Sequence, residues 1–139
     1  MLGNLAKKFL KGGKPSENEW KLDWQERNRA LVAAIREGRA EEARDMAEAL
    51  VAHVEERYTR DAPERATTYN NMGMVLLMEK DFELAEECFR EAVAMRRRLF
   101  GAQHKEVALI YLNLIELYKH MAREILLATV ESVPAEEGQ

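Results

Sequence analysis

Apolar residues recur at intervals of three and four positions along most of the chain, and this spacing predicts a series of amphipathic helices. The core-facing positions of the first two predicted helices are Trp20, Trp24, Leu31, Ala34 and Ile35, and then Ala43, Met46, Ala47, Leu50, Val51 and Val54. Those of the next two are Tyr69, Met72, Gly73 and Leu76, and then Ala85, Phe89, Ala92 and Val93. Because the whole chain holds only 7 Gly and 3 Pro, few turns are expected and the predicted fold class is all-α.

Residues that start and stop helices lie between these stretches. Ser16 and Glu19 have the spacing of a capping box at the start of the first helix. Gly38 is the predicted stop of that helix, because glycine adopts the left-handed conformation that ends many helices. Asp61 as the cap, followed by Pro63 in the first turn, predicts the start of the third helix.

The fourth predicted helix begins near Asp81 and ends in three arginines, Arg96, Arg97 and Arg98. Cations in the last turn of a helix complement the negative end of its dipole. We therefore interpret the arginine run as helix-end chemistry rather than as a nucleic-acid contact.

The chain is also similar to itself. Ala43 aligns with Ala85, which lies 42 positions later (85 − 43 = 42). The same offset relates several further pairs, namely Tyr58 with Phe100, Ala66 with Ala108, Tyr69 with Tyr111, and Asn71 with Asn113. A fixed period of this size indicates stacked repeats that each contain one helix pair.

One stretch of the repeat resembles a known motif. The first helix of this motif carries four characteristic residues, which are a large aromatic, a leucine-like residue, a small residue and a further large residue. Its second helix carries three, which are an alanine, an aromatic and a second alanine. Here these positions are Tyr69, Met72, Gly73, Leu76, Ala85, Phe89 and Ala92. This pattern resembles the tetratricopeptide repeat, and the resemblance implies a right-handed α-solenoid of antiparallel helix pairs with about 2.5–3 repeats.

The period of 42 is similar to that of the long-loop subclass found in the kinesin light chain, rather than to the usual period of 34. The connection between the second and third repeats, residues 99–108, carries most of this likeness. It departs from the subclass at two positions: Phe100 stands between the leucine and the glycine, and Lys105 stands where proline is usual.

The chain divides into three predicted parts: a basic amphipathic arm at 1–15, the repeat domain at 16–133 and an acidic tail at 134–139. The repeats are placed at about 24–65, 66–107 and 108–133. The third repeat is incomplete, because no turn signal follows Tyr118. Either one helix runs from Glu106 to about Ser132, or a break lets a second helix fold back. The fold-back is usual in the resembled family and is the prediction.

In that family the first helix of each repeat lines a concave groove, which implies a non-catalytic protein-interaction module that binds a peptide or helix. The resemblance places the partner-binding residues at Asn28, Arg29, Asn70, Asn71, Met74, Leu77, Met78, Asn113, Glu116, Lys119 and His120. A row of amides is suited to gripping a peptide backbone, and methionines suit loosely specified apolar ligands. The alternatives are that the asparagines only tie adjacent helices together, and that the methionines only fill the core.

Apolar residues near both ends of the chain suggest a second kind of function. The last helix is not polar, although the end of a repeat array normally is. Self-association is therefore predicted to involve Leu2, Leu5, Phe9, Leu10, Ile125, Leu126 and Val130. The alternatives are a homodimer or larger homo-oligomer with a structural role, and a last helix that a partner or residues 1–10 cover. For the arm, they are an arm that frays or packs on its own protein, one that occupies the groove until a partner displaces it, and one that contacts a membrane surface.

Composition narrows the function further. The net charge of −4, from 21 basic and 25 acidic residues, argues against nucleic-acid binding. No metal-ligand spacing or nucleophile arrangement involves His53, His104, His120 or Cys88, so we expect no enzyme activity, metal or cofactor. A single cysteine excludes an intramolecular disulfide, and no apolar run is long enough to span a membrane. The expected location is cytoplasmic.

Overall fold

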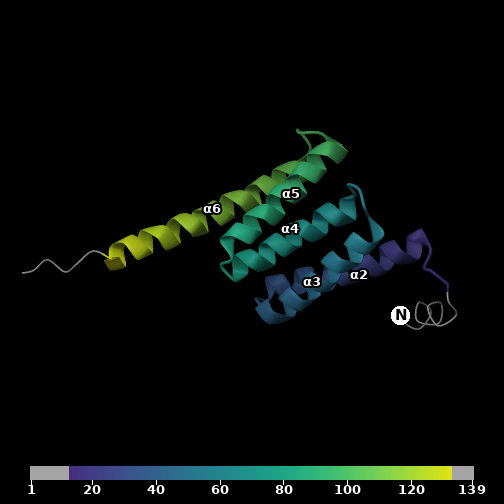
Figure 1. The fold of residues 1–139 in the computed structure, drawn as a ribbon, viewed down its shortest axis with the longest axis horizontal. Coiled ribbons are helices and arrows are strands. Elements are labelled where there is room, and N and C mark those ends of the chain that lie inside the picture. Colours follow the sequence, from purple (N-terminus) through teal and green to yellow (C-terminus); the bar gives the residue numbers. More distant parts are fainter. Residues whose placement is uncertain (1–12, 133–139) are drawn as a thin grey trace, which may run out of the picture.

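A computed structural model describes residues 13–132 (Figure 1). The helices of this segment are α2 (Glu17–Arg36), α3 (Ala40–Arg57), α4 (Pro63–Met78), α5 (Phe82–Phe100) and α6 (Lys105–Ser132). Helices α2 and α3 form one antiparallel pair, α4 and α5 form the next, and α6 lies against α5 and touches α4 (Figure 1). The all-α, tetratricopeptide-like architecture is confirmed. Most of the predicted arm and the whole predicted acidic tail lie outside the described residues.

Two of the predicted helix ends have the expected chemistry. At the start of α2, the Ser16 Oγ accepts a hydrogen bond from the Glu19 backbone N–H at 3.2 Å. The Glu19 carboxylate accepts one from the Ser16 backbone N–H at 2.7 Å, which completes the capping box. After α2, Gly38 has a φ of 70°, in the left-handed region.

The turn after α4 repeats the turn after α2 without a glycine. Lys80 lies 42 positions after Gly38 (80 − 38 = 42) and has a φ of 62°. A side chain in this conformation costs on the order of 1–2 kcal/mol. The turn after α4 therefore has the same backbone conformation as the turn after α2, although lysine does not favour this conformation as glycine does. Lys80 also reaches α6, since its Nζ lies 2.8 Å from Glu124 Oε1.

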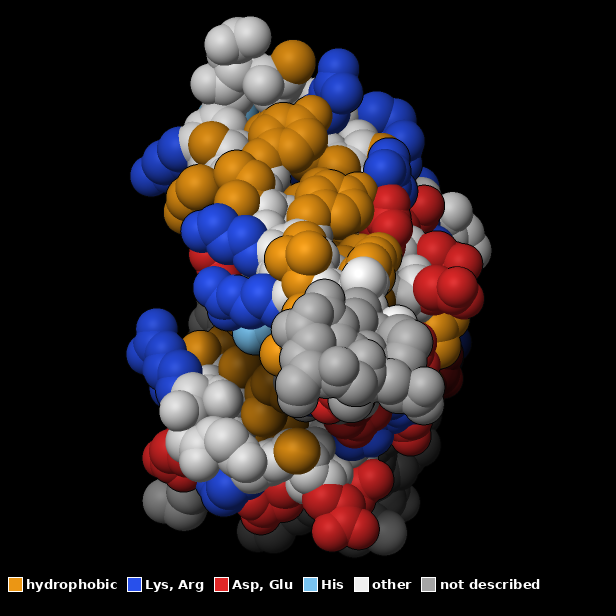
Figure 2. Space-filling model, turned by 90° about the vertical axis from the view of Figure 1, so that its left-hand side faces the viewer, with side chains coloured by type: hydrophobic (Ala, Val, Ile, Leu, Met, Phe, Trp, Pro, Cys, Tyr) orange, Lys and Arg blue, Asp and Glu red, His pale blue; other side chains and the backbone are white. Residues whose placement is uncertain are grey.

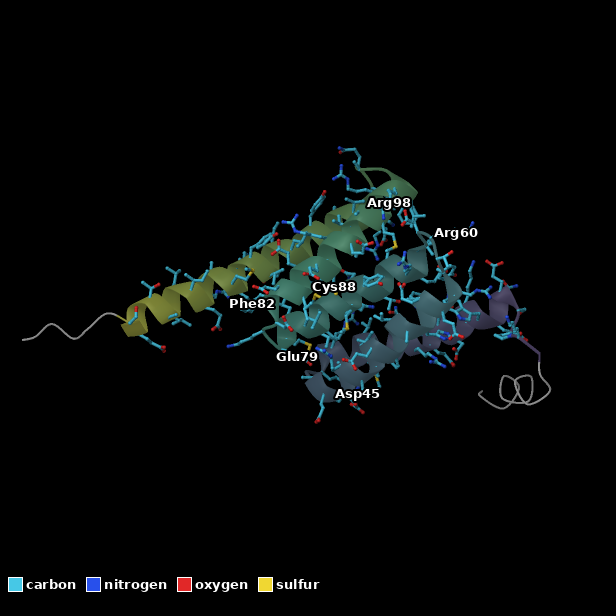
Figure 3. All side chains as sticks on the ribbon, viewed as in Figure 1. Asp45, Arg60, Glu79, Phe82, Cys88 and Arg98 are labelled. Atoms are coloured by element: carbon cyan, nitrogen blue, oxygen red, sulfur yellow. The ribbon has the colours of Figure 1, made fainter. Side chains whose placement is uncertain are left out.

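The predicted cap of α4 is wrong in one respect. The helix begins at Pro63 as expected, but its N-cap is Ala62, which makes no side-chain hydrogen bond. Asp61 instead pairs with Arg98 of α5, with its Oδ2 2.5 Å from Nε and its Oδ1 2.9 Å from Nη2. In Figure 3, Arg98 lies near the loop that carries Arg60. The Asp61 carboxylate therefore forms a bidentate ion pair with α5 instead of capping the first turn of α4.

Small residues bring the helices of each pair close together. In the first pair, Ala34 of α2 packs with Ala43 and Ala47 of α3, and all three are fully buried. In the second pair, a β-carbon added to Gly73 would lie 2.6 Å from Cε1 of Phe89, which is also fully buried. Only glycine allows α4 and α5 to approach this closely. The prediction from the repeat pattern that Phe89 fills the space beside Gly73 is confirmed.

As far as residue 132, where the description ends, the third unit contains one helix. Helix α6 runs without a break from Lys105 to Ser132, so the predicted fold-back is wrong within the described residues. Neither glycine nor proline interrupts this stretch, and the helix continues past the end of the core. Its buried residues end at Leu117, and all residues from Ile125 to Ser132 are exposed. The end of α6 therefore projects beyond α4 and α5 (Figure 1).

Each complete unit of the structure is a pair of helices, a first helix followed by a second. The first helix pair spans residues 17–57 and the second spans residues 63–100. Two hydrophobic clusters fill the interior, one among α2, α3 and α4 and the other among α4, α5 and α6. Met72 of α4 packs against both clusters and joins them. No helix of the described segment has the length and apolar character needed to cross a membrane.

Candidate functional site

Asparagine side chains connect the first helices of successive units. The Nδ2 of Asn71 on α4 donates to the Oδ1 of Asn28 on α2 at 2.6 Å. The Nδ2 of Asn113 on α6 donates to the Oδ1 of Asn70 on α4 at 2.8 Å. The two bonds are equivalent, because donor and acceptor are 43 positions apart in both. These asparagines therefore tie adjacent helices together, which is one of the two roles that the sequence left open.

Each of these amides keeps an unused polar atom. Within residues 13–132, no hydrogen bond is made by the Nδ2 of Asn28 and Asn70 or by the Oδ1 of Asn71 and Asn113. None of these four atoms is both fully buried and without a hydrogen-bond partner. An amide carries two donor hydrogens and an acceptor oxygen, so one bond to a neighbouring helix does not saturate it. The row therefore retains unused donors and acceptors, with Asn28, Asn70 and Asn113 half-buried and Asn71 buried at 8% exposed.

The apolar residues predicted for the groove lie beside this row on α4. Met74, Leu77 and Met78 are all half-buried. Met74 and Leu77 pack in part against the cluster between α4, α5 and α6, so they contribute to the core as well as to the surface. Met78 belongs to neither hydrophobic cluster.

The charged groove residues lie at the outer helices. Arg29 on α2 is exposed, as are Glu116, Lys119 and His120 on α6. Glu116 Oε1 lies 3.2 Å from Lys119 Nζ, within a single turn of the helix. Such an exposed pair contributes little to stability because water screens it. The predicted site thus combines an apolar middle on α4 with polar margins on α2 and α6.

Comparison with protein families agrees with this geometry. A family model described as the tetratricopeptide repeat matches residues 26–98 and again residues 64–124. The chain belongs to the tetratricopeptide repeat family. No match was found among curated proteins or among solved structures.

Membership of the tetratricopeptide repeat family gives the general class of function. These repeats generally mediate protein–protein interactions and are generally non-catalytic. The two overlapping matches cover α3, α4 and α5, the part of α2 from residue 26 onward and α6 as far as residue 124. The protein therefore carries an interaction fold whose partner is a protein.

The structure of this tetratricopeptide repeat protein gives Arg96 a different role from the one that its position in the sequence predicts. Arg96, read as helix-end chemistry, is only 6% exposed. Its Nη2 donates to Thr67 Oγ1 and its Nη1 donates to the Glu106 carbonyl oxygen, both at 3.0 Å. The Glu106 carboxylate lies 3.2 Å from the guanidinium, and burial lowers the Arg96 pKa. Arg96 therefore joins α4, α5 and α6 at one point.

The surroundings of Cys88 do not activate its thiol. Cys88 lies on α5 within the body of the molecule (Figure 3), and burial, followed by the nearby charge of Glu87, raises its thiol pKa to about 11. A thiol with such a pKa is almost fully protonated at neutral pH and is a poor nucleophile. In the described part of the chain, no group of three or more His, Cys, Asp or Glu side chains is placed to hold a metal ion.

The predicted self-association residues separate into two groups. Ile125, Leu126 and Val130 of α6 are 64%, 65% and 71% exposed. Leu2, Leu5, Phe9 and Leu10 lie outside the described residues.

His53 forms part of an aromatic cluster at the α2–α3 contact. Its ring stacks on Trp20 with centroids 4.9 Å apart, and Tyr58 meets Trp20 edge-on at 5.3 Å. Nε2 of His53 lies 3.4 Å from Asp23 Oδ2 but makes no hydrogen bond. Burial, and then the charge of Arg27, lower the His53 pKa below its ordinary value of 6.5, against the opposing effect of Asp23.

This lowered pKa predicts a pH dependence of folding. The unfolded chain binds a proton at His53 near pH 6.5, whereas the folded chain binds it only at lower pH. The free energy of unfolding should therefore fall as the pH drops from about 7.5 through 6.5, and should stop falling on this account below the folded pKa.

Urea titrations between pH 5 and 8 measure this effect, and His53→Gln is expected to flatten the slope. The carboxylates with lowered pKa values, such as Glu55 and Asp61, lose their contribution only below their ordinary values of 4.5 and 3.8. A slope between pH 5 and 7 that is unchanged in His53→Gln would contradict the assignment.

Proposed function

We propose that this protein binds a peptide or helix of a partner protein on the face that α2, α4 and α6 form together, and so acts as an adaptor or scaffold. The observation that carries the proposal is the row of asparagines in register across the three helices. Asn28, Asn70, Asn71 and Asn113 are held in place by their mutual hydrogen bonds, yet each has a polar atom left over. Because these donors and acceptors are already held in place, they lose little conformational entropy when they bind a peptide backbone.

The apolar middle of the face supports the same function. Met74, Leu77 and Met78 are partly accessible on α4, one to two turns along the helix from Asn70 and Asn71. Methionine is flexible and polarisable, so it adapts to apolar side chains of different shapes. We therefore expect a ligand that has aliphatic or aromatic side chains at its centre, with affinity that depends only loosely on its sequence.

Met78 offers the most direct test, because it is half-buried but belongs to neither core cluster. A peptide selected from a displayed random library on the full chain serves as the probe, and its affinity is measured by fluorescence anisotropy. Met78→Lys is expected to weaken binding about tenfold or more, because a charge would replace an apolar contact (about 1.4 kcal/mol per factor of ten). The matched control is Ala49→Lys, which adds the same charge at an exposed position of α3.

The two variants separate binding on this face from binding elsewhere. The proposal requires that Ala49→Lys keep the wild-type affinity and that Met78→Lys unfold within about 1 kcal/mol of wild type. Equal affinity for both variants would place the peptide elsewhere. A failure to select any peptide that wild type binds better than Met78→Lys would overturn the proposal.

A further inference from the structure

In the described segment, helix α6 has no second helix of the kind that completes the other units. Within residues 13–132, α2 pairs with α3 and α4 pairs with α5, but nothing follows α6. Gly73 and Leu76 of α4 pack against α5. Tyr69 packs beside them, while its Oη donates to Glu55 of α3. Moving these three positions by 42 gives the equivalent positions of α6. These are Tyr111, Ile115 and Tyr118, which are 42%, 48% and 41% exposed.

A second helix of the usual kind does not fit this face. In the complete unit, the residue at the close approach is Gly73, and even one added carbon would lie 2.6 Å from Phe89. On α6 the equivalent residue is Ile115, which is β-branched and large. A helix that covers α6 must therefore lie farther from its axis, at the distance of ordinary side-chain interdigitation, about 8–10 Å.

The exposed face of α6 has the spacing of a coiled-coil seam. At its edge toward α5, the Tyr118 hydroxyl accepts from Arg90 at 3.0 Å and donates to Glu86 at 2.8 Å. The Tyr111 hydroxyl accepts from Arg97 of the same helix. Uncharged residues follow one another at intervals of three, four, three, four, three and four: Ala108, Tyr111, Ile115, Tyr118, Ala122, Ile125 and Thr129. Every one of them is exposed. We call these seven residues the α6 seam. A repeat of 3.5 is the pattern by which two helices pack knobs into holes.

We propose that the α6 seam pairs with the α6 seam of a second copy of this chain, with the two helices antiparallel. The seam is self-complementary when one copy is reversed. Tyr118 then lies opposite Ala122 of the second copy, so that a large side chain meets a small one, and the two-fold axis produces the same contact again. Ile115 lies opposite Ile125, and Tyr111 opposite Thr129. Such isologous pairing is what a two-fold dimer requires.

The surroundings of the seam agree with this pairing. Figure 2, which looks at the end of the molecule from which α6 projects, shows hydrophobic side chains gathered on this side with Lys and Arg along one edge. Lys119 lies next to the middle of the seam and would approach Lys119 of the second copy. Each lysine has Glu116 of its own helix 3.2 Å away, which offsets the repulsion.

The exposed area is large enough for a dimer. The large apolar side chains of the seam, with Leu112 and Leu126 beside it, are each between 41% and 65% exposed. They present on the order of 500 Å² per copy, which approaches the lower limit for a stable interface once both copies are counted. Among residues 13–132, nothing packs beneath the last two turns of α6, and a second helix would support them.

Helix α2 begins at Glu17, on the opposite side of the molecule from Ile125–Ser132 (Figure 1).

Sedimentation equilibrium of the full chain, at concentrations from about 1 to 200 µM, tests the proposal. A monomer–dimer equilibrium is expected for wild type. Ile125→Glu and Ala122→Glu place a charge in the seam and should raise the dissociation constant about 100-fold, because a carboxylate would be buried without a partner. Leu127→Glu is the matched control, since Leu127 is 58% exposed but faces away from the seam, two positions from Ile125. It should dimerise like wild type.

Each other outcome overturns the proposal. A wild-type chain that stays monomeric at 200 µM has no such interface. Equal weakening by Leu127→Glu would indicate unspecific hydrophobic association instead. Loss of the dimer on deletion of residues 1–15, with no effect of Ile125→Glu, would assign the contact to the arm.

A crosslinking experiment tests the orientation. In a Cys88→Ala background, Ile115→Cys and Ile125→Cys are combined in one chain and oxidised, and the linked peptides are identified by mass spectrometry. Antiparallel helices join position 115 of one copy to position 125 of the other. Links only between identical positions would show parallel helices and contradict the proposed register.

Discussion

Replacing Phe89 by alanine is expected to lower the free energy of unfolding by about 4 kcal/mol. The side chain is fully buried in the cluster between α4, α5 and α6, and its ring lies directly against Gly73. Because the backbone at Gly73 is already close, the helices have little freedom to collapse into the space that the ring would leave. Loss of buried apolar contact and a residual cavity therefore add together. For a domain with a total stability of about 5–15 kcal/mol, this is a large fraction.

Urea denaturation followed by circular dichroism measures this loss, at one fixed protein concentration so that association does not contribute. Phe100→Ala is the matched control. Phe100 lies on the same helix, is 40% exposed and stacks on His104 at 4.8 Å, so its removal should cost less than about 1 kcal/mol. Similar losses for the two variants would mean that the contact between Phe89 and Gly73 does not determine how α4 and α5 pack.

Replacing Arg96 by methionine is expected to cost about 2–3 kcal/mol. Methionine fills part of the same volume, but Thr67 Oγ1 and the Glu106 carbonyl oxygen would each lose a donor in a part of the protein that water reaches poorly. The Glu106 carboxylate is 34% exposed and would turn to water, which limits the loss. The effect is therefore smaller than that of stranding a fully buried charge.

The neighbouring arginine provides the control for this prediction. Arg97 is exposed, and its contact with Tyr111 Oη is long, at 3.4 Å. Arg97→Met should therefore change the free energy of unfolding by less than about 0.5 kcal/mol. If both variants lost the same amount, the effect would come from charge at the end of α5, as the sequence suggested, and not from the contacts of Arg96.

The partners of the three consecutive arginines could not be predicted from the sequence. Their position at the end of a helix is a local property, and it led to one common explanation for all three. In the structure, Arg96 binds Thr67, which lies 29 positions earlier, and Arg98 binds Asp61, which lies 37 positions earlier. Each partner depends on how α5 packs against α4 and against the loop before it.

The asparagines of the predicted groove show the same limit in another form. The repeat offset correctly placed Asn71 and Asn113 at equivalent positions. It did not show that each donates to an asparagine of the preceding unit, because that partner is 43 positions away, one more than the repeat.

The sequence by itself determined the helices, the repeat and the close packing of Gly73 against Phe89. These features follow from spacings of three and four, from the offset of 42, and from the absence of a side chain at one position, all of which are local or periodic. Only the tertiary structure decided that α6 continues as one helix, that Arg96 is buried and that the asparagines pair across units. Those outcomes depend on contacts between residues far apart in the chain, whose geometry exists only after the helices have packed.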